Sequence, residues 1–166
     1  MSRAFVKEGD DDADALPERP LPTHANYVTA RGLQRLQSRT RELKAQCETL
    51  RPMAGDDSGA KQDLRVAERD LRYFSAQLER AMLVEAGARQ DEVHFGARVT
   101  FVGDDGVEHR VRIVGDDEAD AAAGDISWAS PLARALIGTR AGDSVKWNRP
   151  AGVADIEIVA VHYDLL

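Results

Sequence analysis

Two series of regularly spaced apolar residues, joined by a short polar segment, constrain the fold of this chain more than any other feature. The first series is Leu33, Leu36, Thr40, Leu43, Cys47 and Leu50. The second series is Ala60, Leu64, Ala67, Leu71, Phe74, Leu78 and Ala81. Alternating steps of three and four residues place each series on one side of an α-helix. The sequence therefore predicts an antiparallel coiled-coil hairpin over residues 27–86, with arms of about 35 Å at 1.5 Å per residue.

The segment between the two series is predicted to be the tip of this hairpin, near residues 52–59. Thr29 is suited to cap the first helix, and Pro52 cannot continue its interior. The tip contains two adjacent aspartates, Asp56 and Asp57. Either Asp57 or Ser58 can cap the second helix, and a cap at Ser58 would leave both carboxylates facing outward.

The net charge of −7 is distributed unevenly along the chain. Residues 31–84 carry eleven basic and eight acidic side chains, whereas residues 1–30 and 85–166 are acidic. A positive hairpin in an acidic protein indicates electrostatic docking onto a polyanionic or acidic partner. The alternative, that these arginines only solvate the helices, is equally open on charge alone.

The remaining composition excludes several kinds of site. Cys47 is the single cysteine, and its place in the first apolar series indicates a packed thiol rather than a nucleophile. A single cysteine cannot form a disulfide within the chain, and the four histidines are not spaced like metal ligands. No apolar run reaches membrane-spanning length and no signal core precedes the hairpin, so a cytoplasmic protein without a membrane partner is expected.

The flanking regions differ from the hairpin. Residues 1–26 are acidic and contain prolines, which predicts a disordered tail or a loosely attached arm. After residue 87 the apolar period changes to two, which indicates strands in "ARVTFVG", "VEHRVRIVG", "DSVKWN" and "ADIEIVAVHY". "SPLARALIG" indicates one short helix capped by Ser130. The fold class is therefore α+β, with a hairpin followed by an antiparallel sheet domain over residues 87–166. No catalytic triad, phosphate loop or paired-acid cleft is apparent in that domain.

Several segments resemble the GreA/GreB family of bacterial transcript-cleavage factors. They are "YVTARGLQRL", "RDLRYFSAQL", "FGARVTFVGDDGVEHRVRIVGDDE", "SPLARALIGTRAGDSV" and "PAGVADIEIVAVHY". The resemblance covers residues 27–163, and the segment "FGARVTFVGDDGVEHRVRIVG" resembles the GreB branch in particular. It implies an FKBP-like C-terminal domain that docks at the rim of the secondary channel of RNA polymerase. The hairpin would then enter the channel as part of a monomeric accessory factor, not an enzyme in its own right.

The resemblance also implies a role for the tip acids. Asp56 and Asp57 would help the polymerase hold a second Mg²⁺ near the RNA 3′ end, with Asp56 as the metal ligand, because Mg²⁺ prefers oxygen ligands. The factor would need no cofactor of its own. The family tip reads approximately G-D-x-S-E-N, so Asp56 matches its aspartate while Gly59 stands in place of its glutamate.

Basic residues near the tip have two interpretations. Arg51, Lys61 and Arg65 are suited to contact RNA or the polymerase channel. The competing interpretation is ordinary pairing along the helix with Asp63 and Glu68, which is worth only tenths of a kcal/mol.

The docking loop is expected to use Trp128, Ser130 and Pro131, although Ala129 replaces the aspartate usual in the family. Each hairpin arm is also about one heptad shorter than the family pattern predicts, an estimated loss of about 10 Å of reach. The departures leave open a non-cleaving regulator that occupies the channel and competes with cleavage factors. A third alternative is an adaptor unrelated to polymerase. Prolyl isomerase activity is not expected, because the sequence indicates no aromatic-lined pocket.

Overall fold

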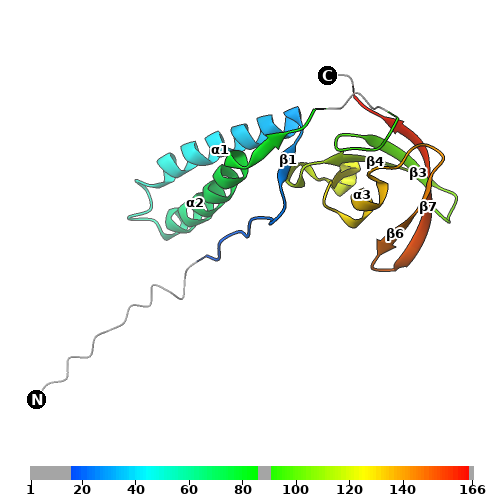
Figure 1. The fold of residues 1–166 in the computed structure, drawn as a ribbon. Coiled ribbons are helices and arrows are strands. Elements are labelled where there is room, and N and C mark those ends of the chain that lie inside the picture. The colour runs from blue at the N-terminus through cyan, green and yellow to red at the C-terminus, as the bar shows by residue number, and fades with distance from the viewer. Residues whose placement is uncertain (1–15, 86–90, 165–166) are drawn as a thin grey trace, which may run out of the picture.

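The computed structural model describes residues 16–85 and 91–164 of the chain. A helical hairpin projects from a curled β-sheet, and the two parts meet where the hairpin begins and ends (Figure 1). Within the described residues, no helix is long and apolar enough to cross a membrane.

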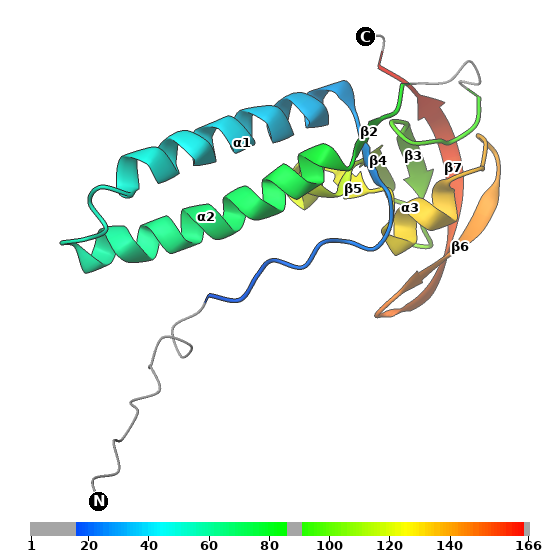
Figure 2. The same cartoon turned by 60° about the vertical axis from the view of Figure 1, so that its left-hand side comes forward.

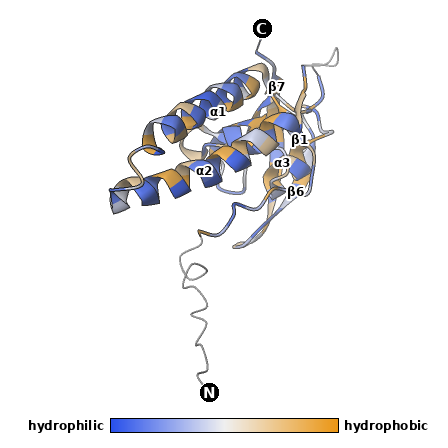
Figure 3. Cartoon of the chain, turned by 90° about the vertical axis from the view of Figure 1, so that its left-hand side faces the viewer, coloured by the Kyte–Doolittle hydropathy of each residue, from blue (hydrophilic) through white to orange (hydrophobic). Residues whose placement is uncertain are grey.

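The predicted hairpin is confirmed. Helix α1 spans Ala30–Leu50 and helix α2 spans Ser58–Glu79, with 21 and 22 residues. At 1.5 Å per residue each arm is about 32 Å long, slightly shorter than expected. The seam side chains Leu36, Leu43 and Ala67 are at most 3% exposed. Each helix has one hydrophobic and one hydrophilic side (Figure 3), so the hairpin is held together mainly by its own seam.

Cys47 lies in this seam with 2% of its surface exposed, and burial raises the pKa of its thiol. Because the thiolate is the reactive form, native Cys47 is expected to react with a disulfide reagent at least about a hundredfold more slowly than the unfolded chain. Absorbance of the released thiol, followed with and without denaturant at pH 8, measures this ratio. Equal rates in the two states would mean that the seam is open in solution.

A small sheet at the base of the hairpin was not predicted. Strand β1, Asn26–Val28, pairs in parallel with strand β2, Ala81–Leu83. Ala81, assigned to the second apolar series, is therefore part of a strand, and α2 ends at Glu79. The hydrogen bonds between β1 and β2 thereby join the two ends of the hairpin at its base.

The second part is a five-stranded mixed sheet in the order β5-β4-β3-β7-β6. Its strands are β3 (Arg98–Val102), β4 (Glu108–Val114), β5 (Asp125–Ser127), β6 (Ser144–Arg149) and β7 (Gly152–His162). The four predicted strands pair antiparallel, but β5 was missed and pairs in parallel with β4. Only three residues long, β5 shows no alternation from which it could be detected.

The predicted short helix is α3, Pro131–Leu136. Ser130 caps it by accepting a hydrogen bond from the Ala133 N–H at 3.2 Å. Leu132, Ala133 and Leu136 pack on one face of the sheet, over a core of fully buried strand residues. Two short 3₁₀ turns, Asp116–Glu118 and Ala121–Ala123, connect β4 to β5.

Residues 16–25 form an arm along α2, which is the second of the two alternatives predicted for residues 1–26, a disordered tail or a loosely attached arm. Residues 1–15 of that prediction lie outside the described residues. In Figure 2 the blue arm runs from β1 back along the hairpin. The Arg19 guanidinium lies 3.9 Å from the centre of the Tyr73 ring and 3.6 Å from the Asp70 carboxylate. Glu18 accepts hydrogen bonds from Arg72. Charge and ring contacts therefore order a segment whose apolar content is too low to order it.

Candidate functional site: hairpin tip, docking loop and joint

The tip of the hairpin is closed by backbone hydrogen bonds. The N–H groups of Met53 and Ala54 each donate to the Leu50 carbonyl at 3.0 Å, and the Asp57 N–H donates to the Met53 carbonyl at 3.2 Å. Asp56 lies in this turn with an exposed side chain, at the end of the hairpin distant from the sheet (Figure 2). The fold therefore presents the Asp56 carboxylate to solvent, about 30 Å along the helices from the sheet at 1.5 Å per residue.

The second tip acid has a structural task. One oxygen of Asp57, Oδ1, accepts hydrogen bonds from the N–H groups of Gly59 and Ala60, at 2.8 and 3.2 Å. Asp57 is thus the N-cap of α2, and the alternative in which Ser58 caps the helix is wrong. A Cβ at Gly59 would lie 3.1 Å from the same oxygen, so a larger residue there would crowd the cap.

Replacing Asp57 by alanine is expected to lower the free energy of unfolding by about 1 kcal/mol, because two N–H groups at the start of α2 lose their acceptor. Asp57→Asn keeps a capping oxygen and should be close to wild type. Asp56→Ala is the matched control at the neighbouring position. Urea unfolding of the four proteins measures the effect, and equal stability of Asp57→Ala and wild type would refute the capping role.

The basic residues near the tip lie in different settings. Arg51 donates to Glu68 across the hairpin at 3.1 Å, so this pair joins the two helices instead of forming within one. Lys61 is exposed in the first turn of α2, and Arg65 is half-buried one turn further on. The structure therefore places Lys61 next to the tip carboxylates and gives Arg51 a partner inside the hairpin.

The loop predicted to dock, residues 128–131, is held by hydrogen bonds and ring contacts. Ser130 caps α3, and the exposed Pro131 begins it. The backbone N–H of Trp128 donates to the Val114 carbonyl at 2.9 Å, and the indole ring lies against Tyr27 and His24, with ring centres 4.8 and 5.3 Å away. Trp128 is therefore half-buried where the N-terminal arm meets the sheet, and only part of its surface is available to a partner.

A cavity of about 470 Å³ opens beside α3. Its lining includes Phe101, His109, Trp147 and Leu132. The expectation that the sheet has no aromatic-lined pocket is therefore wrong. Residues from all five strands of the sheet and from α3 line this cavity, so their proximity could not be read from the sequence order.

An acidic loop that sequence reasoning did not assign, Asp116–Glu118, joins the hairpin to the sheet. Glu118 is 3% exposed and accepts hydrogen bonds from the Thr29 N–H at 3.2 Å and from the Thr29 hydroxyl. Thr29 in turn caps α1 by accepting from the Gly32 N–H at 3.0 Å. The buried carboxylate therefore holds the first residues of α1.

Its two neighbours hold the other elements. Asp117 accepts from the Tyr73 hydroxyl at 3.0 Å and from Gln77 at 2.8 Å, both on α2. Burial, together with the Asp117 charge, raises the pKa of Tyr73 to about 12, so its hydroxyl remains a donor. Asp116 accepts from Ser127 and pairs with His24 of the arm. One three-residue turn thereby contacts both helices, the arm and β5, and fixes the direction in which the hairpin points.

The available metal ligands are few. Among residues 16–85 and 91–164, no group of three or more His, Cys, Asp or Glu side chains could hold a metal ion. Asp56 offers one exposed carboxylate, and Mg²⁺ commonly binds through one or two protein carboxylates while keeping several waters. The tip can therefore supply one ligand to a metal ion whose other ligands come from outside this hairpin.

Comparison with known proteins gives consistent relatives. The family model "Transcription elongation factor, GreA/GreB, C-term" matches residues 88–163. Transcription elongation factor GreB of Neisseria meningitidis serogroup B is 40% identical over 153 residues, covering 83% of this chain and 94% of that protein. Transcription elongation factor GreA of Azorhizobium caulinodans is 43% identical over 106 residues, covering 63% and 68%. The crystal structure of GreA factor homolog 1 of Thermus thermophilus aligns with a TM-score of 0.40 and 25% identity, covering 84% of this chain and 99% of that one.

Proposed function

The chain belongs to the GreA/GreB family of transcription elongation factors, and we propose that it stimulates RNA polymerase to cleave backtracked transcripts. The observation that carries this proposal is the exposed Asp56 carboxylate at the far end of a hairpin whose base is clamped to the sheet. In this proposal the protein acts as a monomer and contributes a side chain to the active centre of the polymerase. It is an accessory factor, and the hydrolysis belongs to the polymerase.

The tip residues have different roles in this proposal. Asp56 would be the ligand for a second Mg²⁺ shared with the polymerase, and that ion stabilises charge on the oxygens of an in-line displacement. Asp57 holds the first turn of α2, so it supports the position of Asp56 through the backbone. Lys61, one turn from Asp57 and exposed, is placed to contact RNA phosphates, with Arg51 and Arg65 as further cations.

Docking on the rim of the secondary channel would use the loop before α3. Pro131 is exposed, and the Ser130 hydroxyl accepts from the Ala133 N–H, which gives the loop one defined shape. The cavity beside Leu132 adds an apolar surface next to that loop. Since Ala129 lacks a charge, this docking relies on shape and apolar contact more than on an ion pair.

A second candidate function is a non-cleaving regulator that occupies the same channel. Gly59 stands where the family has a glutamate, and the arms have only 21 and 22 residues. A hairpin with arms one heptad shorter than the family pattern would end about 10 Å before the position that the tip of a longer hairpin reaches, and so before the catalytic metal.

The two functions are separated by adding purified protein to stalled, backtracked polymerase complexes with labelled RNA. Shortening of the RNA from its 3′ end supports the cleavage function. Binding to the complexes without shortening, together with inhibition of an authentic cleavage factor, supports the regulator. Failure to bind polymerase core would contradict both.

A further inference from the structure

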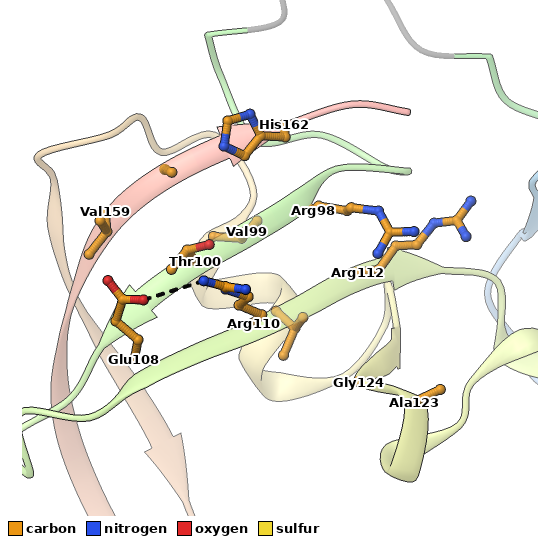
Figure 4. Close-up of a pocket in the computed structure, with 12 residues that line it drawn as sticks. Arg98, Val99, Thr100, Glu108, Arg110, Arg112, Ala123, Gly124, Val159 and His162 are labelled. Atoms are coloured by element: carbon orange, nitrogen blue, oxygen red, sulfur yellow. Dashed lines mark ion pairs between the residues drawn. The ribbon is translucent and has the colours of Figure 1, made fainter. Parts of the chain in front are cut away.

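The face of the sheet opposite α3 carries an unusual set of side chains. Because side chains alternate along a strand, Val99, Phe101 and Ile113 point to the core, and their neighbours point the other way. On that outer face Arg98 lies directly across from Arg112 in the β3–β4 ladder, and Thr100 lies across from Arg110. Together with His162 of β7 they line a cavity of about 520 Å³ (Figure 4).

Two like charges facing each other across a ladder destabilise a sheet unless an anion lies between them. Asp164, just after β7, supplies one: it accepts from Arg98 Nε at 2.8 Å and Nη2 at 3.1 Å, and lies 3.8 Å from Arg112 Nη2. The hydrogen bonds from Arg98 lower the pKa of Asp164, which keeps it charged. The contact with the Asp164 carboxylate thus shows that Arg98 and Arg112 are arranged to bind an oxyanion.

The arginines on this face still have N–H groups that Asp164 does not occupy. Arg112 is 16% exposed, and its Nε is buried without a hydrogen-bond partner among the described residues. Arg110 is 80% exposed and, among the described residues, forms an ion pair only with Glu108, at 3.7 Å (Figure 4). An unpaired buried guanidinium N–H is costly, so a further acceptor in the cavity would be stabilising.

We propose that Arg98, Arg110 and Arg112 form a phosphate-binding site on the outer face of the sheet, hereafter the outer-sheet arginine site. The planar fork of a guanidinium matches two oxygens of a phosphate, and charge-assisted bonds of this kind are the strong ones. Alternate residues of one strand are about 6.6 Å apart, so Arg110 and Arg112 can each bind a different phosphate of a chain. The phosphates belong either to a free nucleotide polyphosphate or to a nucleic-acid backbone, which share this chemistry.

The surroundings indicate that phosphate, not a base, is recognised. Among the described residues, the only ring in the cavity lining is the imidazole of His162, and the lining also includes small residues such as Ala123 and Gly124. Base recognition normally uses aromatic platforms. Arg98 and Arg112 lie on the face of the sheet opposite α3, away from the proposed docking loop and the hairpin tip. Arg110 and Gly124 stand where this cavity adjoins the one beside Leu132 and line both of them.

The test uses the full-length protein with two probes, tripolyphosphate and a short labelled oligothymidylate. Arg110→Gln should weaken tripolyphosphate binding by about tenfold, as measured by calorimetry at low salt. Asp164→Asn removes the internal competitor and should strengthen binding several-fold, a gain that damage to the fold would not produce. Arg41→Gln, an exposed arginine of α1, is the charge-matched control and should have no effect.

The two probes distinguish the sources of phosphate. Tighter binding of the oligothymidylate, lost in Arg110→Gln but not in Arg41→Gln, assigns the site to a nucleic-acid backbone. Tripolyphosphate binding without binding of the oligothymidylate at this site assigns it to a free polyphosphate. The proposal is overturned if wild type and Arg110→Gln bind both probes equally, or if Asp164→Asn fails to bind more tightly than wild type.

Discussion

Replacing Glu118 by alanine is expected to lower the free energy of unfolding by about 3 kcal/mol, the largest stability effect of any single substitution proposed for this protein. The carboxylate is buried and accepts from the Thr29 N–H, the Thr29 hydroxyl and the Gly115 N–H. Removing it leaves three buried donors unsatisfied, each worth about 1–3 kcal/mol before water enters the space. Urea unfolding followed by far-ultraviolet circular dichroism measures the loss.

A second substitution separates this role from a general loss of packing. A Cβ built on Gly32 would lie 2.2 Å from Glu118 Oε2, so Gly32→Ala should destabilise the wild-type protein. In a helix without such a neighbour, the same change stabilises by up to about 1 kcal/mol. Gly32→Ala should therefore stabilise the Glu118→Ala protein. If the effects of the two substitutions simply add, the contact does not determine the stability of the joint.

The sequence predicted those elements whose evidence is local. Heptad spacing predicted both helices, and the alternation of apolar and polar residues predicted the four longer strands, because each pattern depends only on neighbouring residues. The joint depends on residues far apart in the chain: Thr29 and Glu118 are 89 positions apart, and Tyr73 and Asp117 are 44. The run of three acids directly after a buried strand was the available signal. The same run of acids is equally typical of an exposed, charged turn, so its buried contacts could not be predicted.

The candidate site was predicted in part for the same reason. The position of the tip followed from the two helices, so Asp56 was placed correctly at an exposed turn. Which of Asp57 and Ser58 caps α2 depends on the dihedral angles of the turn, and the composition permits either. Trp128 was expected to be an outward anchor, but its contacts with Tyr27 and His24 depend on an arm that sequence reasoning left without a position.

Replacing Asp56 by alanine is expected to reduce transcript cleavage by about a hundredfold, if the protein acts as a cleavage factor. Loss of one preorganised electrostatic group from an active centre typically costs that much, and each factor of ten corresponds to about 1.36 kcal/mol of transition-state free energy. The substitution removes an exposed side chain from a turn closed by backbone bonds, so the stability of the hairpin should not change. The rate of RNA shortening in backtracked complexes measures the effect.

The decisive control is competition. Asp56→Ala retains the joint, the docking loop and the Asp57 cap, so it should displace wild-type protein from polymerase at equal concentration and thereby inhibit cleavage by it. Asp57→Asn keeps the cap through its remaining oxygen and should cleave close to the wild-type rate, because Asp57 acts through the backbone of the tip. Cleavage by Asp56→Ala at the wild-type rate would remove Asp56 from the metal site. A large loss in Asp57→Asn with stability unchanged would instead assign the ligand role to the second acid, and the cap would then be an additional task of the same side chain.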